Sequence, residues 1–298
     1  MIGYLYLTIA LFGGLAKGFC GKKTSSDMDT FKDCLFINVA RMLFCAVIGF
    51  LLVLIEWNFS SLALTANNVW IYIMSSVGMT TFCVLWMYAY KADAYVFLNI
   101  FTMLGSIVTC LLSFIVFGDK IKVNQWIGMA ILLVAVITMS KYNKELKGKI
   151  SLKGILILIF GCLGCAVSDF SQKLYMRNIG ESVATFNFYT YAFGFILLAI
   201  LQIMVSAKEK SFSVTPAVSS KKNLPIYFLM SFFLFLNTVF KTMAAGLLTS
   251  AQIYPVLQGS NLICSALMAQ IFFKEKVNYK SILGMSIAFI GLLVMNLL

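Results

Sequence analysis

Histidine does not occur in this sequence of 298 residues, and charged residues make up only 11% of it. Without histidine the chain has neither an HExxH zinc motif nor a histidine general base. A P-loop and a pair of aspartates inside the apolar runs are also absent. These absences count against a membrane-embedded enzyme and against direct use of ATP. Soluble proteins carry about a quarter charged residues, so this chain has too few to cover a surface that faces water.

Hydrophobic residues account for 61% of the chain, and its mean hydropathy is +0.94. A helix needs about 20 apolar residues to cross the hydrocarbon core of a bilayer. Ten runs of about that length cover residues 2–20, 35–56, 69–90, 93–116, 124–141, 152–174, 183–206, 225–247, 249–273 and 279–298. They lack the alternation of apolar and polar residues that a transmembrane β-barrel requires. The sequence therefore predicts an all-α polytopic membrane protein with ten transmembrane helices.

The connections between these runs are short, and none is long enough to hold a folded soluble domain. The longest, residues 207–224, contains serines, lysines and Pro216. From this composition we expect it to be a flexible tether.

The net charge of +12 would suggest a nucleic-acid partner for a soluble protein, but in membrane proteins Lys and Arg collect in cytoplasmic loops. With ten spans, the odd-numbered loops lie on one side and carry sixteen lysines, against four basic residues on the other side. We therefore expect no nucleic acid, cytoplasmic odd-numbered loops and both termini outside the cell. No basic segment precedes the first run, which argues against a cleaved signal peptide.

Eight cysteines are present, and seven of them lie within or at the ends of apolar runs. Cys162 and Cys165 form a C-x-x-C pair, a spacing that also occurs in metal and redox sites. Inside an apolar helix, in a chain without histidine, packing is the favoured interpretation. We expect neither a metal nor a cofactor.

One passage occurs twice in the sequence. FGDKIKVNQWIGM spans 117–129 and FKEKVNYKSILGM spans 273–285, so the copies lie 156 residues apart. Matches also occur in the first span of each half at an offset of 151, where Gly13 corresponds to Gly164, and in the second spans at an offset of 149. Ordered matches at the beginning, middle and end of the halves indicate an internal repeat.

Each half contains five spans, and an odd number places the second half upside down relative to the first. We expect a five-helix repeat in residues 1–145 and an inverted one in residues 146–298. Inverted repeats are typical of secondary transporters, whose substrate site lies between the halves. The two fused halves already form a pseudo-dimer, which is compatible with a monomer.

This arrangement resembles the drug/metabolite transporter superfamily, in its ten-helix EamA-type branch. The resemblance rests on the acid-Lys turn and glycine in both copies of the repeated passage, on Arg41 early in the second span, and on Lys22 and Lys173 after the glycine-rich first and sixth spans. It covers the whole chain and implies a transporter without naming a substrate. Many bacterial members are thought to have both termini in the cytoplasm, whereas the charge bias here predicts the opposite.

Four charged residues lie at membrane depth: Lys17, Arg41, Asp169 and Lys241. A charge there costs about 2.5–3.5 kcal/mol on insertion scales, so each is a candidate functional residue. Arg41 could clamp a carboxylate or phosphate, and the two lysines could attract an anion. For each cation the alternative is snorkelling to the nearer membrane face or a structural ion pair.

Asp169 is the only acidic residue well inside a span, and its counterpart in the first half is Gly18. It could bind a coupling proton or a substrate amine. The alternative is an ion pair with Lys173, which lies four residues further along the same helical face.

Uncharged polar and aromatic residues extend the set of candidates, because such side chains suit a cavity that binds a small organic molecule. For each residue the alternative is a hydrogen bond between helices or anchoring at the membrane interface. The candidates are Asn38, Trp86, Tyr90, Tyr95, Asn99, Asn187, Tyr191, Asn237, Gln252, Tyr254, Gln258 and Asn261.

These observations favour a secondary active transporter of the cell membrane over an enzyme or a structural subunit. Three cations and one acid inside the spans favour a zwitterionic or anionic metabolite, such as an amino acid, moved by alternating access with proton coupling or exchange. Efflux of drugs or other cations is the alternative. The small multidrug resistance relatives carry a key carboxylate in their first span, where this chain has Lys17.

Overall fold

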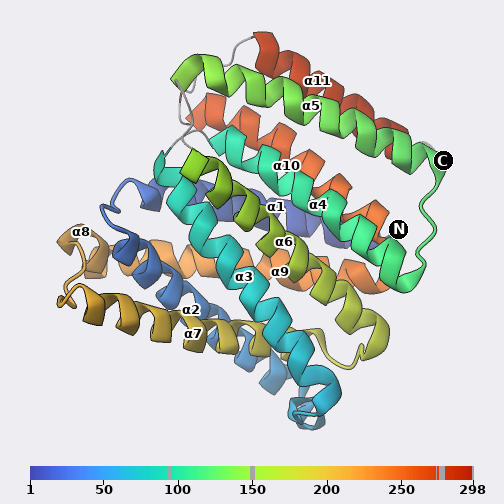
Figure 1. The fold of residues 1–298 in the computed structure, drawn as a ribbon. Coiled ribbons are helices and arrows are strands. Elements are labelled where there is room, and N and C mark those ends of the chain that lie inside the picture. The colour runs from blue at the N-terminus through green and yellow to red at the C-terminus, as the bar shows by residue number, and fades with distance from the viewer. Residues whose placement is uncertain (93–94, 148–151, 273, 275–278, 297–298) are drawn as a thin grey trace.

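The computed structural model describes residues 1–298 except 93–94, 148–151, 273, 275–278 and 297–298. Over the described residues, helices are the only regular elements (Figure 1). The first half contains α1 (Ile2–Ser25), α2 (Phe31–Glu56), α3 (Ala66–Ala92), α4 (Tyr95–Phe117) and α5 (Val123–Lys147). The second half contains α6 (Leu152–Asn178), α7 (Val183–Lys208), the short α8 (Pro216–Ser219), α9 (Leu224–Leu247), α10 (Ser250–Phe272) and α11 (Tyr279–Asn296). Short 3₁₀ helices lie at Phe59–Leu62 and Lys221–Asn223.

Five stretches of described residues are long and apolar enough to cross a membrane: Ile2–Ser25, Phe31–Glu56, Ala66–Tyr88, Val183–Lys208 and Lys221–Leu247. Shorter apolar helical stretches occur at Thr102–Phe117, Val123–Ala135 and Ile282–Met295. The predicted all-α fold is therefore confirmed over the described residues. These five stretches do not confirm the predicted number of ten spans.

Large apolar side chains face outward from the bundle. On α2, Leu43 and Ile55 are 43% and 77% exposed, and on α7, Ile200 and Ile203 are 53% and 59% exposed. Soluble monomers rarely expose large continuous apolar patches, whereas lipid tails can cover such a surface. The outer faces of these helices therefore suit a bilayer.

Helices of the first half pack mainly against helices of the second half. The most extensive contacts join α1 to α9, α3 to α6, α2 to α7, α4 to α10 and α5 to α11. Figure 1 shows α5 beside α11 at one edge of the bundle and α2 beside α7 at the opposite edge. If α6, α7, α9, α10 and α11 correspond to α1–α5, then the α1–α9 and α3–α6 contacts are equivalent. Each of the other three pairs joins a helix to its own counterpart.

Two glycines at matching positions permit the equivalent contacts. A Cβ added to Gly13 of α1 would lie 2.9 Å from the backbone nitrogen of Asn237 on α9. A Cβ added to Gly164 of α6 would lie 2.9 Å from the backbone nitrogen of Phe82 on α3. Small residues allow helix backbones to approach closely in membranes, so the match between Gly13 and Gly164 has a structural cause.

The segment between α7 and α9 is not the flexible tether that its composition suggested. It contains α8, and Val218 of that helix is fully buried. Thr215 donates hydrogen bonds from its backbone nitrogen and its hydroxyl to the buried carboxylate of Asp33, at 2.9 and 2.7 Å. The same carboxylate accepts from the backbone nitrogens of Asp29 and Thr30 at 2.9 and 2.8 Å. One buried acid thus ties the segment to the start of α2, which composition alone could not indicate.

We expect the substitution Asp33→Ala to release this segment. It removes the acceptor for Thr215 and the carboxylate that completes the capping box with Thr30 at the start of α2, a loss of about 2–4 kcal/mol from hydrogen bonds to a charged group and part of a helix cap. Limited proteolysis and amide exchange over residues 209–220 should both become faster. Ser219→Ala, which alters an exposed hydroxyl in the same segment, is the control. Unchanged proteolysis of the Asp33 variant would contradict the anchoring role.

Candidate functional site

A small polar cavity lies between α1, α3, α4, α6, α9 and α10, and is therefore walled by both halves of the chain. Its volume is about 40 Å³, which is room for a few water molecules. Three charged side chains line it: Lys17, Asp169 and Lys241. Three of the four charges predicted at membrane depth thus meet in one place.

Many of the lining residues are counterparts of one another in the repeat. These counterparts are Gly14 and Cys165, Lys17 and Ser168, and Gly18 and Asp169 at an offset of 151, and Phe82 and Thr238, and Thr102 and Gln258, at an offset of 156. Positions at matching offsets in the two halves therefore line the same cavity. The charges do not follow this symmetry, because the repeat counterpart of Asp169 is a glycine and that of Lys17 is a serine.

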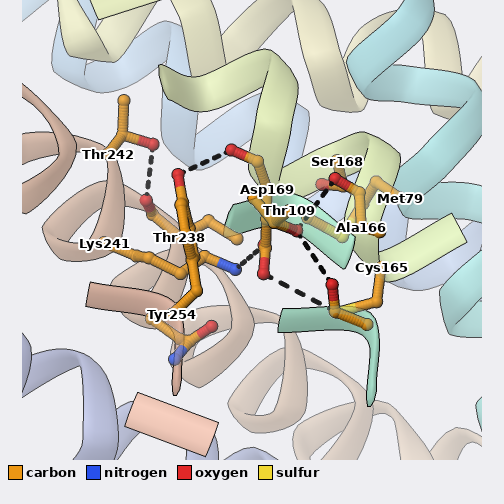
Figure 2. A network of polar contacts seen from close by, with 12 residues as sticks. Met79, Thr109, Cys165, Ala166, Ser168, Asp169, Thr238, Lys241, Thr242 and Tyr254 are labelled. Atoms are coloured by element: carbon orange, nitrogen blue, oxygen red, sulfur yellow. Dashed lines mark hydrogen bonds and ion pairs between the residues drawn. The ribbon is translucent and has the colours of Figure 1, made fainter. Parts of the chain in front are cut away.

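The ammonium of Lys241, on α9, forms an ion pair with the carboxylate of Asp169, on α6. The two side chains are only 7% and 1% exposed. Tyr254 of α10 donates a hydrogen bond of 2.6 Å to the backbone carbonyl of Asp169, and the sulfur of Cys165 lies 3.8 Å from Oδ2. Figure 2 shows Asp169 contacted in this way from α9 and α10. The ion pair and the hydrogen bond from Tyr254 therefore link three helices of the second half at the wall of the cavity.

Lys173 is not the partner of Asp169 that a spacing of four residues suggested. Its ammonium donates to the backbone carbonyls of Ala245 and Leu248, at 2.8 and 2.6 Å, where α9 ends. The last carbonyls of a helix lack partners within the helix and carry its negative dipole end. Lys173 therefore caps α9, which leaves Asp169 to Lys241.

Lys17 is the third charge at the cavity. Its ammonium lies 5.5 Å from the ring centroid of Phe82 and 5.2 Å from that of Trp86, so α3 holds it by cation–π contacts. Its side chain is buried, and within the described part of the chain it has no ion pair or hydrogen bond. Arg41 and Lys241 lie close enough to repel it. Among the described residues of the cavity wall, Lys17 is therefore the one positive charge without a charged partner.

Arg41 is fully buried on α2 but lies outside the cavity wall. Its Nη1 donates to the side-chain oxygen of Asn38 at 2.8 Å, while Nε and Nη2 have no partner among the described residues. Asn38 donates to the carbonyl of Cys34, and its repeat counterpart Asn187 donates to the carbonyl of Val183, both at 2.8 Å. The structure thus places Asn38 and Asn187 in matching bonds within their own helices, away from the cavity.

Three more of the predicted residues lie outside the wall and support it. Gln252 accepts hydrogen bonds from the backbone nitrogen and hydroxyl of Thr249, at 3.0 and 3.1 Å, and so caps the start of α10. The hydroxyl of Tyr191 lies 2.7 Å from that of Thr238, which lines the cavity. Tyr254 holds the backbone at Asp169, as described above.

Trp86, Asn237, Gln258 and Asn261 are predicted residues that do line the cavity. Asn237 donates a hydrogen bond of 2.6 Å to the carbonyl of Ala10, which joins α9 to α1. Gln258 reaches only the sulfur of Cys165, at 4.0 Å. The amide of Asn261 has no hydrogen bond within the described residues, so it remains open to a ligand.

Tyr90, Tyr95 and Asn99 belong to α3 and α4, but their side chains lie outside the described part of the structure. Glu275 of the second repeated passage lies outside the described residues as well.

Asp119, in the first repeated passage, pairs with Arg177 near the end of α6, and the guanidinium lies 5.2 Å from the ring centroid of Phe117. This acid therefore links the turn after α4 to the second half and does not face the cavity.

Several small residues that line the cavity were not among the residues predicted from the sequence, and Ser168 and Thr238 are examples. Ser168 is 2% exposed, and its hydroxyl has no hydrogen-bond partner among the described residues. Ser168 directly precedes Asp169, and Thr238 precedes Lys241 by three positions. Their proximity to a buried charge was the available signal, although serines and threonines are common in membrane helices without such a role.

Comparison with known proteins agrees with this geometry. The model of the EamA-like transporter family matches residues 1–141 and 152–297, which together cover nearly the whole chain. The chain belongs to the EamA-like transporter family. A solved structure described as "Crystal structure of protein" covers 99% of this EamA-like chain and 96% of its own, with a TM-score of 0.72 at 12% identity. At that identity the likeness concerns the fold alone. No curated protein matches the sequence.

Family membership confirms the resemblance to the drug/metabolite transporter superfamily. Members of this family are transporters and not enzymes. The EamA-like chain is thus a helical membrane protein with the function of a transporter, and the polar cavity is its candidate substrate site.

The ion pair yields a testable prediction for this EamA-like transporter. Asp169→Asn or Lys241→Met alone should lower the stability by about 3–5 kcal/mol, because the remaining charge is buried without a partner. An Asp169→Leu/Lys241→Met double variant should recover most of this loss. Thermal denaturation of the purified protein in detergent measures both effects.

Arg177→Gln is the matched control, because it breaks an ion pair whose arginine is 46% exposed and should lower the stability by less than about 1 kcal/mol. If the losses of the two single variants simply add in the double variant, the two charges are not coupled.

Proposed function

We propose that this EamA-like transporter is a secondary active transporter that moves a small organic metabolite across the cytoplasmic membrane by alternating access. The carrying observation is the cavity between the two halves, which counterpart residues of both halves line. Substrate sites of transporters with inverted repeats lie at such an interface. The cavity, at about 40 Å³, has room for a few water molecules, so in the proposed mechanism helices move apart to admit the substrate.

The architecture that we propose consists of ten spans in two inverted five-helix repeats, residues 1–145 and 146–298. The packing of the helices supports this arrangement, because three of the most extensive contacts join counterpart helices of the two halves and the other two, α1–α9 and α3–α6, are equivalent to each other. The two halves already form the complete interface, so a monomer suffices.

For the substrate we propose a zwitterionic or anionic metabolite, such as an amino acid or a related compound. The uncompensated ammonium of Lys17 at the cavity supports an acidic group on the substrate. Asp169 is the proposed coupling residue, because a proton on its carboxylate would weaken the pair with Lys241 and so link protonation to helix movement. Exchange of one metabolite for another is the second form of coupling.

Efflux of cationic compounds is the second candidate function. The observation that favours it is the presence of two aromatic rings, Phe82 and Trp86, and one carboxylate, Asp169, in the cavity wall. Such groups bind organic cations. In this structure, however, the rings hold Lys17 and the carboxylate holds Lys241, so the protein's own lysines occupy both cation sites.

We expect purified protein in proteoliposomes to take up carboxylates or amino acids, tested alongside phosphorylated metabolites and quaternary amines. Lys17→Gln should lower the rate at limiting substrate by about 30-fold or more, because loss of a buried charged partner removes about 2 kcal/mol or more. Lys23→Gln, an exposed lysine at the end of the same helix, is the control.

Transport of quaternary amines alone would favour the efflux alternative, and no transport of any class would contradict a transporter with this site. Asp169→Asn should abolish stimulation by a pH gradient while the protein still binds substrate. Unchanged stimulation would remove Asp169 from the coupling mechanism.

The proposed orientation places both termini outside the cell and the odd-numbered loops in the cytoplasm. In a background without reactive cysteines, a cysteine at Lys120 should react with a membrane-impermeant maleimide in intact cells. A cysteine at Lys222 should react only after the cells are opened. The reverse pattern would show that the charge bias predicts the wrong orientation.

A further inference from the structure

The charges at the cavity leave one cation without a partner. Lys241 and Asp169 neutralise each other, while Lys17 has no ion pair among the described residues. We infer that the substrate carries a net negative charge: it is a monoanionic carboxylate without a compensating amine, and Lys17 binds its carboxylate. This inference rests on the proposed function and decides between the two substrate classes that the proposed function allows.

The position of Lys17 supports binding of an acidic group. Phe82 and Trp86 contact its ammonium through their ring faces. A ring face attracts the positive charge but does not offer the directed acceptor atom that a carboxylate offers. An ammonium has three donors, and those of Lys17 make no hydrogen bond within the described part of the chain. The side chain is 9% exposed and lines the cavity, so these donors are available to a ligand there.

Ser168 provides an independent observation at the same site. It is the repeat counterpart of Lys17, so it reaches the cavity from α6 as Lys17 does from α1. Its hydroxyl is buried and has no partner among the described residues, and buried polar groups are nearly always hydrogen-bonded. A carboxylate has two oxygens that accept hydrogen bonds, one for the ammonium and one for the hydroxyl. The amide of Asn261 adds a neutral donor to this wall.

A substrate amine has no comparable partner. Among the described residues, Asp169 is the only acidic side chain that lines the cavity, and Lys241 already occupies its carboxylate. An amine would have to displace Lys241, which would then remain in the wall as a second unpaired cation near Lys17. A single carboxylate on the substrate could not compensate both lysines. A monoanion, by contrast, neutralises Lys17 and leaves the Lys241–Asp169 pair intact.

The test uses probes with one carbon skeleton and different charges. Lactate, alanine and alaninamide form one set, and phenyllactate, phenylalanine and phenylalaninamide form a second set with a larger side chain. Affinities are measured by thermal shift and calorimetry on the purified full-length protein. In at least one set, the hydroxy acid should bind about tenfold more tightly than the amino acid, which corresponds to about 1.4 kcal/mol. The amide should not bind.

Matched variants assign the effect to residues. Lys17→Gln should remove the preference for the hydroxy acid, and Ser168→Ala should weaken its binding several-fold, while Lys23→Gln should leave both unchanged. Asp169→Asn should retain or strengthen the preference for the acid, because it frees Lys241 as a second cation. Thermal denaturation without ligand identifies any variant that fails to fold. If Lys17→Gln fails to fold, Lys17→Arg serves as the second test. It keeps the positive charge and should therefore retain the preference for the hydroxy acid.

Two results would overturn the inference. One is tighter binding of the amino acid than of the hydroxy acid in both sets, with loss of that binding in Asp169→Asn. The other is an acid preference that survives in Lys17→Gln. In either case transport of amino acids in proteoliposomes would leave the proposed function standing, whereas absence of transport for every class would contradict the proposed function itself.

Discussion

The ion pair between Lys241 and Asp169 lies where α9 meets α6, and the polar centre of the bundle depends on it. Neither charge could remain alone at this depth, because an unpaired buried charge costs several kcal/mol. Tyr254 fixes the backbone at Asp169, and Lys173 fixes the end of α9 against α6. These contacts join α6, α9 and α10. A movement that separates these helices must therefore break the contacts, and otherwise the helices move together.

Within a symmetric arrangement of helices, the charges are placed asymmetrically. Gly13 and Gly164 make equivalent close contacts, and five pairs of counterpart positions face the cavity. Yet the acid has a glycine counterpart, and Lys17 has a serine counterpart. The proposed alternating access uses the two similar halves of the repeat, while the proposed charged substrate would meet unequal charges on the two sides of the cavity.

Much of the fold was predictable from the sequence, and much less of the site. Apolar runs revealed the helices because lipid requires each spanning segment to satisfy its own backbone hydrogen bonds. Lys17, Asp169 and Lys241 were predictable as site residues because a charge at membrane depth is costly and is rarely kept there without a role. Sequence spacing failed for Lys173, whose partners are carbonyls of another helix, and for the segment that Asp33 anchors. Gln252 was predicted at the site but caps its own helix.

The sequence by itself determined the helical membrane class, the two-fold repeat and the superfamily, since these depend on composition, period and order along the chain. Only the tertiary structure decided which charges are paired. Lys241 and Asp169 are 72 residues apart, and Lys17 lies on a third helix. Ion pairing depends on distances of a few ångströms between helices, which no spacing within one helix can indicate. The substrate proposal rests on the ammonium of Lys17, which has no ion pair or hydrogen bond among the described residues, and this is visible only once these distances are known.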